Sequence, residues 1–298
     1  MNYNILGNST LDISEIAFGC MSLGNNVAEN ETLINQALDK GINFFDTADL
    51  YQQGENEKQL GRALKERRND AIIATKVGNQ WRSDGSGWDW NPSPEYIKKA
   101  VDDSLRRLDT DYIDLYQLHG GTLDDPIDDI IETFEQLQRQ GKIRYYGISS
   151  IRPNVIREYV KRSRISSVMM QYSLLDRRPE EEVFQLLDKN NIGVLARGSV
   201  AKGLLAGKPA EPYLNYSAEE VSRIAKIVAK FSEDKRTPAQ TAICYVLGEP
   251  AVRAAVVGIR TLTQLEEAAG LPATTPLTSA DRVLLGFELA ANYYDQHR

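Results

Sequence analysis

The stretch Ile16-Ala17-Phe18-Gly19-Cys20-Met21-Ser22-Leu23-Gly24 decides between the two folds that the rest of the chain allows. It begins with a short apolar run of the kind found in buried strands. A doubly wound sheet that binds a dinucleotide usually carries the pattern G-x-G-x-x-G directly after its first strand. Here Met21-Ser22-Leu23-Gly24 follows the strand, and the pattern occurs nowhere else in the chain. The first strand therefore favours a closed barrel over a doubly wound sheet.

Further apolar runs follow, with amphipathic segments between them. The expected strands cover residues 16–20, 43–46, 71–77, 113–118, 143–148, 168–172, 193–196 and 253–257, after a small hairpin at 2–6 and 10–13. Helical spacing marks residues 29–40, 57–67, 97–108, 127–137, 154–162, 180–190 and 238–247. Near-continuously apolar strands that alternate with helices indicate a parallel sheet covered on its outside. We therefore predict an α/β fold: a single (β/α)8 TIM barrel, one domain over residues 1–298, with a short N-terminal β-hairpin.

The charge and composition of the chain exclude several classes of partner. A net charge of −7 at pH 7 speaks against a general nucleic-acid or anionic-membrane surface. No apolar stretch approaches the roughly 20 residues that span a bilayer, and no export signal is evident at the N-terminus. Cys20 and Cys244 have no partner at metal-ligand spacing. We expect a cytoplasmic protein without a bound metal and without nucleic-acid or membrane partners, and we leave its oligomeric state open.

Polar residues follow three successive strands of the expected barrel. The second strand ends at Asp46 with Tyr51 shortly after it, the third ends near Lys76, and the fourth is followed by His119. The carboxyl ends of barrel strands meet at one rim, so these four side chains can converge. Taken singly, Asp46 could cap a helix, and Tyr51 is one of 14 tyrosines. Their joint placement favours a catalytic group.

The chemistry of such a group is that of a proton donor to a carbonyl. A free tyrosine has a pKa of about 10, and a neighbouring ammonium lowers that pKa. Asp46 would keep Lys76 charged and oriented, so that the phenol of Tyr51 becomes a useful proton donor. His119 would give the substrate oxygen a second hydrogen bond. The group suits polarisation of a C=O bond during hydride transfer.

These residues lie in motifs that resemble those of a known family. The run Asp46-Thr47-Ala48-Asp49-Leu50-Tyr51, followed by Gly54-Glu55-Asn56-Glu57, resembles the signature of aldo-keto reductases, and so do Ala74-Thr75-Lys76 and Tyr116-Gln117-Leu118-His119. The likeness is greatest to the bacterial general-stress-type branch. It implies an NADP(H)-dependent oxidoreductase that reduces aldehydes or ketones to alcohols by hydride transfer. It also implies a catalytic tetrad in which Asp46, Lys76 and His119 assist Tyr51, the proton donor.

The resemblance places the nicotinamide and pyrophosphate contacts on the later strands. Ser149 and Gln171 would contact the nicotinamide carboxamide, although Ser150 replaces the usual asparagine. The loop after the seventh strand would hold the pyrophosphate through Arg197, Gly198, Val200, Lys202 and Gly203. The family often has an aromatic ring at the position of Arg197, and a planar guanidinium could also stack on the nicotinamide. The plainer interpretation of this loop is a glycine-containing turn.

The segment after the eighth strand resembles the one that grips the adenosine 2′-phosphate. Its implied contacts are Gly258, Arg260, Thr261, Gln264 and Glu267, whereas Ala268 replaces a usual asparagine. An arginine is a natural bidentate partner of a phosphate. Thr261 could instead simply cap the following helix.

The substrate pocket is less defined by the sequence. His119 is followed by Gly120-Gly121, where the family often has Trp-Pro, so we expect a bulky wall to be lost. Residues 79–92 are too polar for a core element, and we expect a loop there. Its three tryptophans, Trp81, Trp88 and Trp90, could cover a small carbonyl substrate or pack locally.

Three other functions stay open at this point. The same tetrad would serve an NADP-dependent alcohol or sugar dehydrogenase working in the oxidative direction. Some members of this family act as redox-sensing subunits of ion channels, with NADPH as a ligand. An unrelated barrel could use Arg260 to hold a phosphorylated substrate.

Overall fold

The computed structural model describes residues 1–233 and 235–298, and it contains the closed parallel barrel that the sequence predicts. The barrel strands are β3 (Ile16–Gly19), β4 (Phe44–Asp46), β5 (Ile72–Val77), β8 (Ile113–Leu118), β9 (Ile143–Ser149), β10 (Ser167–Gln171), β11 (Gly193–Arg197) and β12 (Val252–Gly258). They follow one another around the barrel in chain order, and β12 pairs with β3 to close it. Every expected barrel strand begins and ends within one residue of an observed strand. The fold prediction is therefore confirmed.

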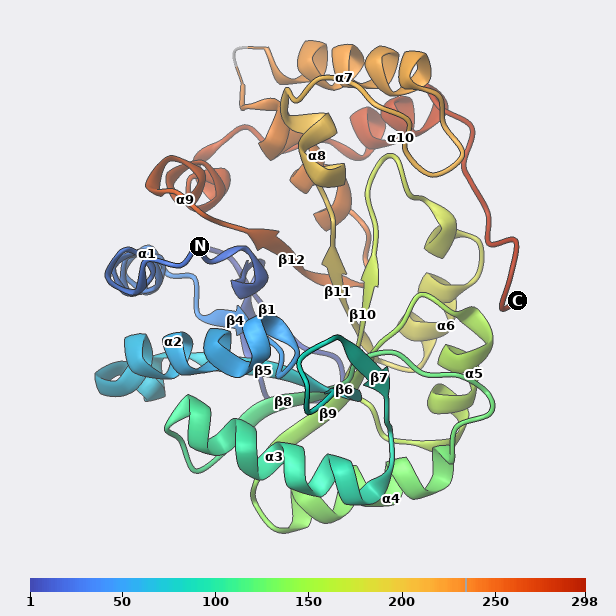
Figure 1. Cartoon of the computed structure of the whole chain (residues 1–298). Helices are drawn as coiled ribbons and strands as arrows, with labels where there is room; N and C mark the ends of the chain where they lie inside the picture. Colours follow the sequence, from blue (N-terminus) through green and yellow to red (C-terminus); the bar gives the residue numbers. More distant parts are fainter. Residues whose placement is uncertain (234) are drawn as a thin grey trace.

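Helices surround the strands (Figure 1). The seven predicted segments correspond to α1 (Val27–Asp39), α2 (Glu55–Leu64), α3 (Pro94–Leu108), α4 (Ile127–Arg139), α5 (Pro153–Arg162), α6 (Val183–Lys189) and α8 (Pro238–Leu247), and α9 (Leu262–Ala269) follows Thr261. Two helices that we did not predict, α7 (Ala218–Ser232) and α10 (Ser279–Phe287), lie beyond α8 at the top of Figure 1. Among the described residues, no helix has the length and apolar character needed to cross a membrane.

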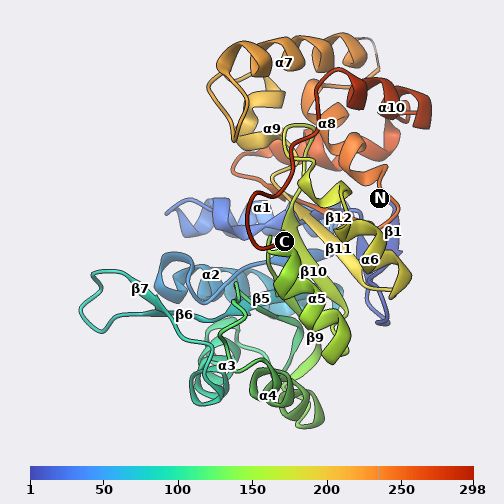
Figure 2. The ribbon, with the colours of Figure 1, turned by 90° about the vertical axis from the view of Figure 1, so that its right-hand side faces the viewer.

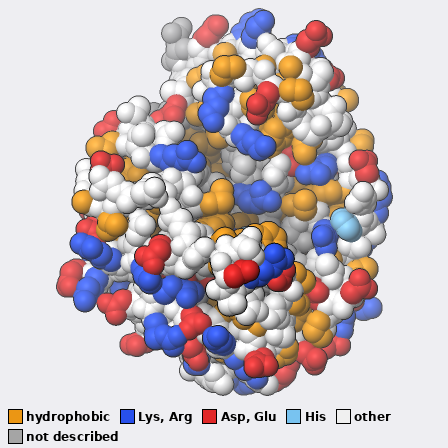
Figure 3. Space-filling view, in the orientation of Figure 1, with side chains coloured by type: hydrophobic (Ala, Val, Ile, Leu, Met, Phe, Trp, Pro, Cys, Tyr) orange, Lys and Arg blue, Asp and Glu red, His pale blue; other side chains and the backbone are white. Residues whose placement is uncertain are grey.

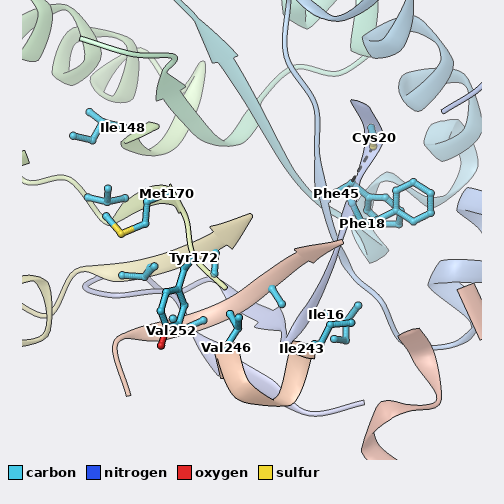
Figure 4. Packing of buried hydrophobic residues seen from close by; sticks show 14 of the residues in the cluster. Ile16, Phe18, Cys20, Phe45, Ile148, Met170, Tyr172, Ile243, Val246 and Val252 are labelled. Carbon is cyan, nitrogen blue, oxygen red and sulfur yellow. Dashed lines mark hydrogen bonds between the residues drawn. The ribbon is translucent and has the colours of Figure 1, made fainter. Parts of the chain in front are cut away.

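The alternation of side chains along the strands divides the core into two layers. In β3, Ala17 belongs to a small cluster that fills the barrel, whereas Ile16 and Phe18 belong to the larger cluster beneath the helices. Figure 4 shows part of this outer layer, where the rings of Phe18 and Phe45 have centroids 5.7 Å apart. The same alternation directs polar residues near the strand ends into the barrel.

The predicted N-terminal hairpin covers the end of the barrel at which the strands begin. Its strands β1 (Tyr3–Ile5) and β2 (Asp12–Ser14) pair antiparallel. Between them, Gly7 has a φ of +53°, and a Cβ there would lie 2.2 Å from the carbonyl oxygen of Ser166, next to the start of β10. This close approach to the strand starts requires a glycine. The hairpin therefore leaves the carboxyl rim of the barrel open.

The prediction of an irregular loop at residues 79–92 is wrong. The strands β6 (Asn79–Trp81) and β7 (Trp88–Trp90) form an antiparallel hairpin there. It projects from the body of the molecule in Figure 2. The hairpin is short and polar, and we expected a loop because its hydrophobicity is too low for a core strand.

We predict that Gly61→Ala destabilises the fold. A Cβ on Gly61 of α2 would lie 2.4 Å from the carbonyl oxygen of Leu108 at the end of α3, and backbone cannot yield cheaply. The overlap should exceed the gain in helix propensity and lower the free energy of unfolding by about 2 kcal/mol. Urea denaturation measures this loss. Gly24→Ala is the control, because no atom of the described residues lies within 4 Å of its Cβ position. Equal stability of the two variants would contradict the prediction.

Candidate functional site

The four candidate catalytic residues lie at the carboxyl rim of three adjacent strands. Asp46 ends β4, Lys76 lies near the end of β5, and His119 directly follows β8. Because side chains alternate along a strand, Lys76 points to the same side as Ala74, into the barrel. Tyr51 begins the short 3-10 helix η2 (Tyr51–Gly54) after β4. The structure thus brings together all four residues that the sequence analysis grouped.

The ammonium of Lys76 is the centre of this group. Its Nζ lies 2.7 Å from Asp46 Oδ2, 2.7 Å from the Thr47 carbonyl oxygen and 3.2 Å from the Tyr51 hydroxyl. These three acceptors use all three N–H donors of the ammonium. Lys76 is only 1% exposed, so its charge depends on these partners. The Tyr51 oxygen accepts from Lys76, which leaves the phenolic proton free to be donated elsewhere.

Burial and the neighbouring charges have opposite effects on these groups. Burial disfavours the ammonium form of Lys76, but the attraction of Asp46 and Tyr51 outweighs it and raises the pKa of Lys76. Burial raises the pKa of Tyr51, although Lys76 opposes the rise. The expectation that Lys76 lowers the Tyr51 pKa overall is therefore wrong, because burial of the phenol is the larger effect. Tyr51 remains protonated at neutral pH, as a proton donor must.

The imidazole of His119 faces Tyr51 in an edge-to-face arrangement, with ring centroids 5.9 Å apart. Burial, together with the charges of Lys76 and Arg197, lowers the pKa of His119 to about 3. The ring is therefore neutral at physiological pH and has one N–H donor. Such a ring can give a carbonyl oxygen a hydrogen bond.

Buried polar pairs hold the loop between β4 and α2, and we did not predict this role. Thr47 Oγ1 donates to Asn56 Oδ1 at 2.7 Å. Glu57 accepts from Thr75 Oγ1 at 2.6 Å and from Arg107 Nε at 2.6 Å. Glu57 is fully buried, so this ion pair fixes the start of α2 against α3 and β5. The sequence signal that could have indicated this role is the motif Gly54-Glu55-Asn56-Glu57.

The backbone after Tyr51 is strained. Gln52 and Gln53 have φ of 49° and 55°, in the left-handed region that non-glycine residues rarely adopt. Gly54 follows with φ of +87°, and a Cβ on it would lie 2.7 Å from Arg107 Cδ. Strained residues persist only where the surrounding structure holds them. The contacts of α2 and α3 therefore determine where Tyr51 stands.

Asp49 is a buried carboxyl in the same loop. Its Oδ2 accepts from the Tyr96 hydroxyl at 3.2 Å, and its Oδ1 has no partner among the residues that the structure describes. Burial, with the like charge of Glu57, raises the pKa of Asp49 to about 7. The charge of this carboxyl thus changes near neutral pH.

The candidate nicotinamide contacts lie on the next strands of the rim. Ser149 ends β9, Gln171 ends β10 and Arg197 ends β11. Arg197 Nη1 donates to Gln171 Oε1 at 3.0 Å, and Gln171 Nε2 donates to the hydroxyl of Tyr213 at 2.8 Å. The Gln171 amide is thus oriented from both ends. Tyr213 is a contact that the sequence did not indicate.

The candidate pyrophosphate loop follows β11. Gly198 has φ of +78°, and Ala201, Lys202 and Gly203 have φ of 47°, 58° and 94°. Ser199 is buried, and its Oγ has no partner among the described residues. A turn of left-handed residues beside an unpartnered hydroxyl is suited to an anion. Val200 is half-buried and Lys202 exposed, so the loop presents a cation to solvent.

The segment after β12 combines a close backbone approach with an exposed cation. Gly258 ends the strand, and a Cβ on it would lie 2.2 Å from Ser22 Oγ. Arg260 is exposed, and its backbone N–H, not its guanidinium, donates to Gln264 Oε1 at 2.9 Å. The guanidinium of Arg260 is therefore available to a phosphate. Figure 3 shows Lys and Arg side chains around a hollow on the face that carries the β6–β7 hairpin.

Other implied adenosine contacts in this segment have structural roles. Thr261 caps α9 and accepts from Gln264 N at 3.2 Å, as the plainer interpretation proposed. The carbonyl oxygen of Glu267 accepts from Gln240 Nε2 at 2.7 Å, and Glu267 is half-buried. These contacts hold α9 in position.

Comparisons with known proteins show what the sequence and the fold of the whole chain resemble. The model of the Aldo/keto reductase family matches residues 15–282. The uncharacterized oxidoreductase YqkF of Bacillus subtilis is 48% identical, over 98% of this chain and 98% of its own. A solved aldo-keto reductase of Bacillus halodurans, in its holo form, superimposes with a TM-score of 0.94 at 50% identity, over 100% of this chain and 99% of its own.

Two less similar relatives name different nicotinamide cofactors. One is the aldo-keto reductase yakc of Schizosaccharomyces pombe, named with NADP(+), at 31% identity over 88% of this chain and 84% of its own. The other is the NADH-specific methylglyoxal reductase of Escherichia coli, at 32% identity over 70% of each chain. These names leave the choice between the two cofactors to the residues of this chain.

We predict that Asp49→Asn changes how stability depends on pH. A carboxyl whose pKa is raised to about 7 in the folded state binds a proton that the unfolded chain has lost, so its contribution declines as pH rises from 4 to 7. Asparagine stays neutral. The free energy of unfolding of the variant, taken relative to that of the native protein, should therefore rise by about 2 kcal/mol as pH increases from 5 to 8. Urea denaturation at several pH values measures the difference. A gap between the two proteins that is independent of pH would refute it.

Proposed function

Because the chain belongs to the aldo-keto reductase family, we propose that this oxidoreductase reduces aldehydes or ketones to alcohols with NADPH, and that Tyr51 is its proton donor. The observation that carries the proposal is the buried ammonium of Lys76, 3.2 Å from the Tyr51 hydroxyl and paired with Asp46. A lysine is rarely buried without such partners. Its position supports a role in the chemistry of the phenol.

The residues of the chain supply the proton and the polarisation in this mechanism. NADPH, when bound, supplies the hydride for the carbonyl carbon. Tyr51 donates its proton to the carbonyl oxygen, and the phenolate that remains is stabilised by the ammonium of Lys76. Neutral His119 gives the same oxygen a hydrogen bond. Asp46 holds Lys76 charged throughout, so the reverse reaction, alcohol oxidation, uses the same groups.

We propose that the rest of the rim holds the cofactor. Ser149 and Gln171 would contact the nicotinamide carboxamide, and Arg197 would stack on its ring. The loop with Gly198, Val200, Lys202 and Gly203 would hold the pyrophosphate. Gly258, Arg260, Thr261, Gln264 and Glu267 would hold the adenosine part. The Ser199 hydroxyl, which has no partner among the described residues, and the exposed Arg260 guanidinium support a phosphate-bearing ligand along this path.

The choice of NADPH over NADH rests on the exposed guanidinium of Arg260. We further propose that the chain is one domain and acts in the cytoplasm on a small carbonyl compound, without nucleic-acid or membrane partners. The net charge of −7 and the two free thiols support this placement.

We predict that Tyr51→Phe abolishes most carbonyl reduction while NADPH still binds. Phenylalanine keeps the ring and lacks the proton, so kcat should fall by about 100-fold or more. NADPH absorbance with nitrobenzaldehydes and methylglyoxal measures turnover, and cofactor fluorescence measures binding. Tyr293→Phe, at an exposed ring, is the matched control. Substantial activity of Tyr51→Phe would remove the proton-donor assignment. If the native protein binds NADPH tightly but reduces none of the aldehydes, a sensing role is favoured.

We predict that Arg260→Ala weakens the binding of NADPH much more than that of NADH. Loss of a charged hydrogen bond to the 2′-phosphate should raise the Kd for NADPH about tenfold or more. The Kd for NADH should change little, because NADH lacks that phosphate. Fluorescence titration with both cofactors measures the two constants, and Arg139→Ala, an exposed arginine of α4, is the control. Equal losses for both cofactors would overturn the NADPH assignment.

A further inference from the structure

The β6–β7 hairpin presents one face to the two polar segments of the candidate active site. Its register pairs Asn79 with Trp90 and Trp81 with Trp88, so these four side chains share a face. Asn79 Nδ2 donates to the carbonyl oxygen of His119 at 3.2 Å. This face of the hairpin is therefore bound to the rim of the barrel.

Trp81 fixes the hairpin to the segment that carries Tyr51. Its Nε1 donates to the carbonyl oxygen of Leu50 at 3.0 Å. Trp88, the cross-strand neighbour of Trp81, lies farther out and is 48% exposed. The hairpin thus contacts the residue before Tyr51 and, through Asn79, the backbone of His119 itself.

Trp90 occupies the space above two glycines of the rim. Ring atoms of its indole lie 2.5 Å from the Cβ position of Gly78 and 3.1 Å from that of Gly120, the residue after His119. The φ angles of Gly78 and Gly120 are +126° and +149°. Side chains at these positions would be strained and would also meet the indole. The wall that we expected to be lost at Gly120 is therefore supplied by a residue 30 positions earlier in the chain.

The indole of Trp90 is also held at its polar edge. Its Nε1 donates to Asp125 Oδ1 at 2.9 Å, and the other oxygen of Asp125 accepts from the N–H of Thr122. Trp90 as a whole is half-buried, and its ring lies beside Gly120, the residue that follows His119. A flat ring held in this way is suited to stack on another flat group.

We propose that Trp90 is a specificity-determining wall of the substrate pocket, and that it favours flat aromatic or conjugated aldehydes over small aliphatic ones. This inference rests on the proposed carbonyl reduction at Tyr51. A carbonyl oxygen within reach of Tyr51 and His119 leaves the rest of the substrate near Gly120, where the indole stands. An aromatic ring gains contact there, and a two- or three-carbon aldehyde does not reach far enough to do so.

The test compares the ratio of two specificity constants across three variants. The ratio is kcat/KM for 4-nitrobenzaldehyde over kcat/KM for propanal, with NADPH. In Trp90→Leu this ratio should fall about tenfold, mainly through KM for the aromatic substrate. Trp90→Phe retains an aromatic face and should keep the ratio within about threefold of the native one. Trp88→Leu, on the same hairpin but farther out, should leave it unchanged.

An unchanged ratio in Trp90→Leu, or an equal fall in Trp88→Leu, overturns the role of Trp90 and leaves the proposed reaction standing. If the native protein reduces no aldehyde, the proposed function fails. The binding of an aromatic probe then tests whether Trp90 forms a wall of the pocket. The probe is 4-(trifluoromethyl)benzyl alcohol, followed by ¹⁹F NMR with NADP(+) present. Weaker binding to Trp90→Leu than to the native protein and Trp88→Leu supports the wall, and equal binding to all three overturns it.

Discussion

The buried charge of Lys76 is the constraint on which the rest of the site depends. An ammonium that is 1% exposed has lost its hydration, a cost of several kcal/mol that only close partners offset. The partners are Asp46, the Thr47 carbonyl and the Tyr51 hydroxyl, and all three belong to β4 and the loop after it. Displacement of that loop would remove two of the three acceptors of the buried ammonium. The ammonium of Lys76 therefore holds the loop in one place and also lies beside the hydroxyl of Tyr51.

The outer helices contribute to this arrangement although they lie outside the barrel. The loop contains the left-handed residues Gln52 and Gln53, which cost free energy and need support. Support comes from the ion pair between the buried Glu57 and the half-buried Arg107, which joins α2 to α3. Removal of Arg107 would be far more harmful than the net contribution of the pair suggests, because the charge of Glu57 stays buried. Stability and catalysis are thus coupled at the start of α2.

The strands and the grouping at the rim could be predicted because they follow from local patterns. Short apolar runs give the strands, and a barrel brings all carboxyl ends to one rim, so Asp46, Lys76 and His119 needed no knowledge of side-chain contacts. The β6–β7 hairpin could not be predicted in this way, because its strands have only three residues each, lie within a polar segment and are stabilised by distant contacts such as Trp81 with Leu50. The pKa of Tyr51 was predicted in the wrong direction because burial depends on the complete fold. The roles of the cofactor residues remain predictions.

The rim of the barrel has two parts that we expect to differ in how many substitutions they tolerate. The ends of β9 to β12 carry glycines, left-handed turns and cations, and the cofactor that we propose to be held there by backbone groups would tolerate few changes. The β6–β7 hairpin is attached to the other part by a few side-chain contacts, and its tip projects into solvent. A change of indole, or of the Asp125 partner that orients it, would alter the wall beside His119 without moving Lys76. The proposed substrate wall at the hairpin can therefore vary while the proposed proton donor and its partners stay as they are.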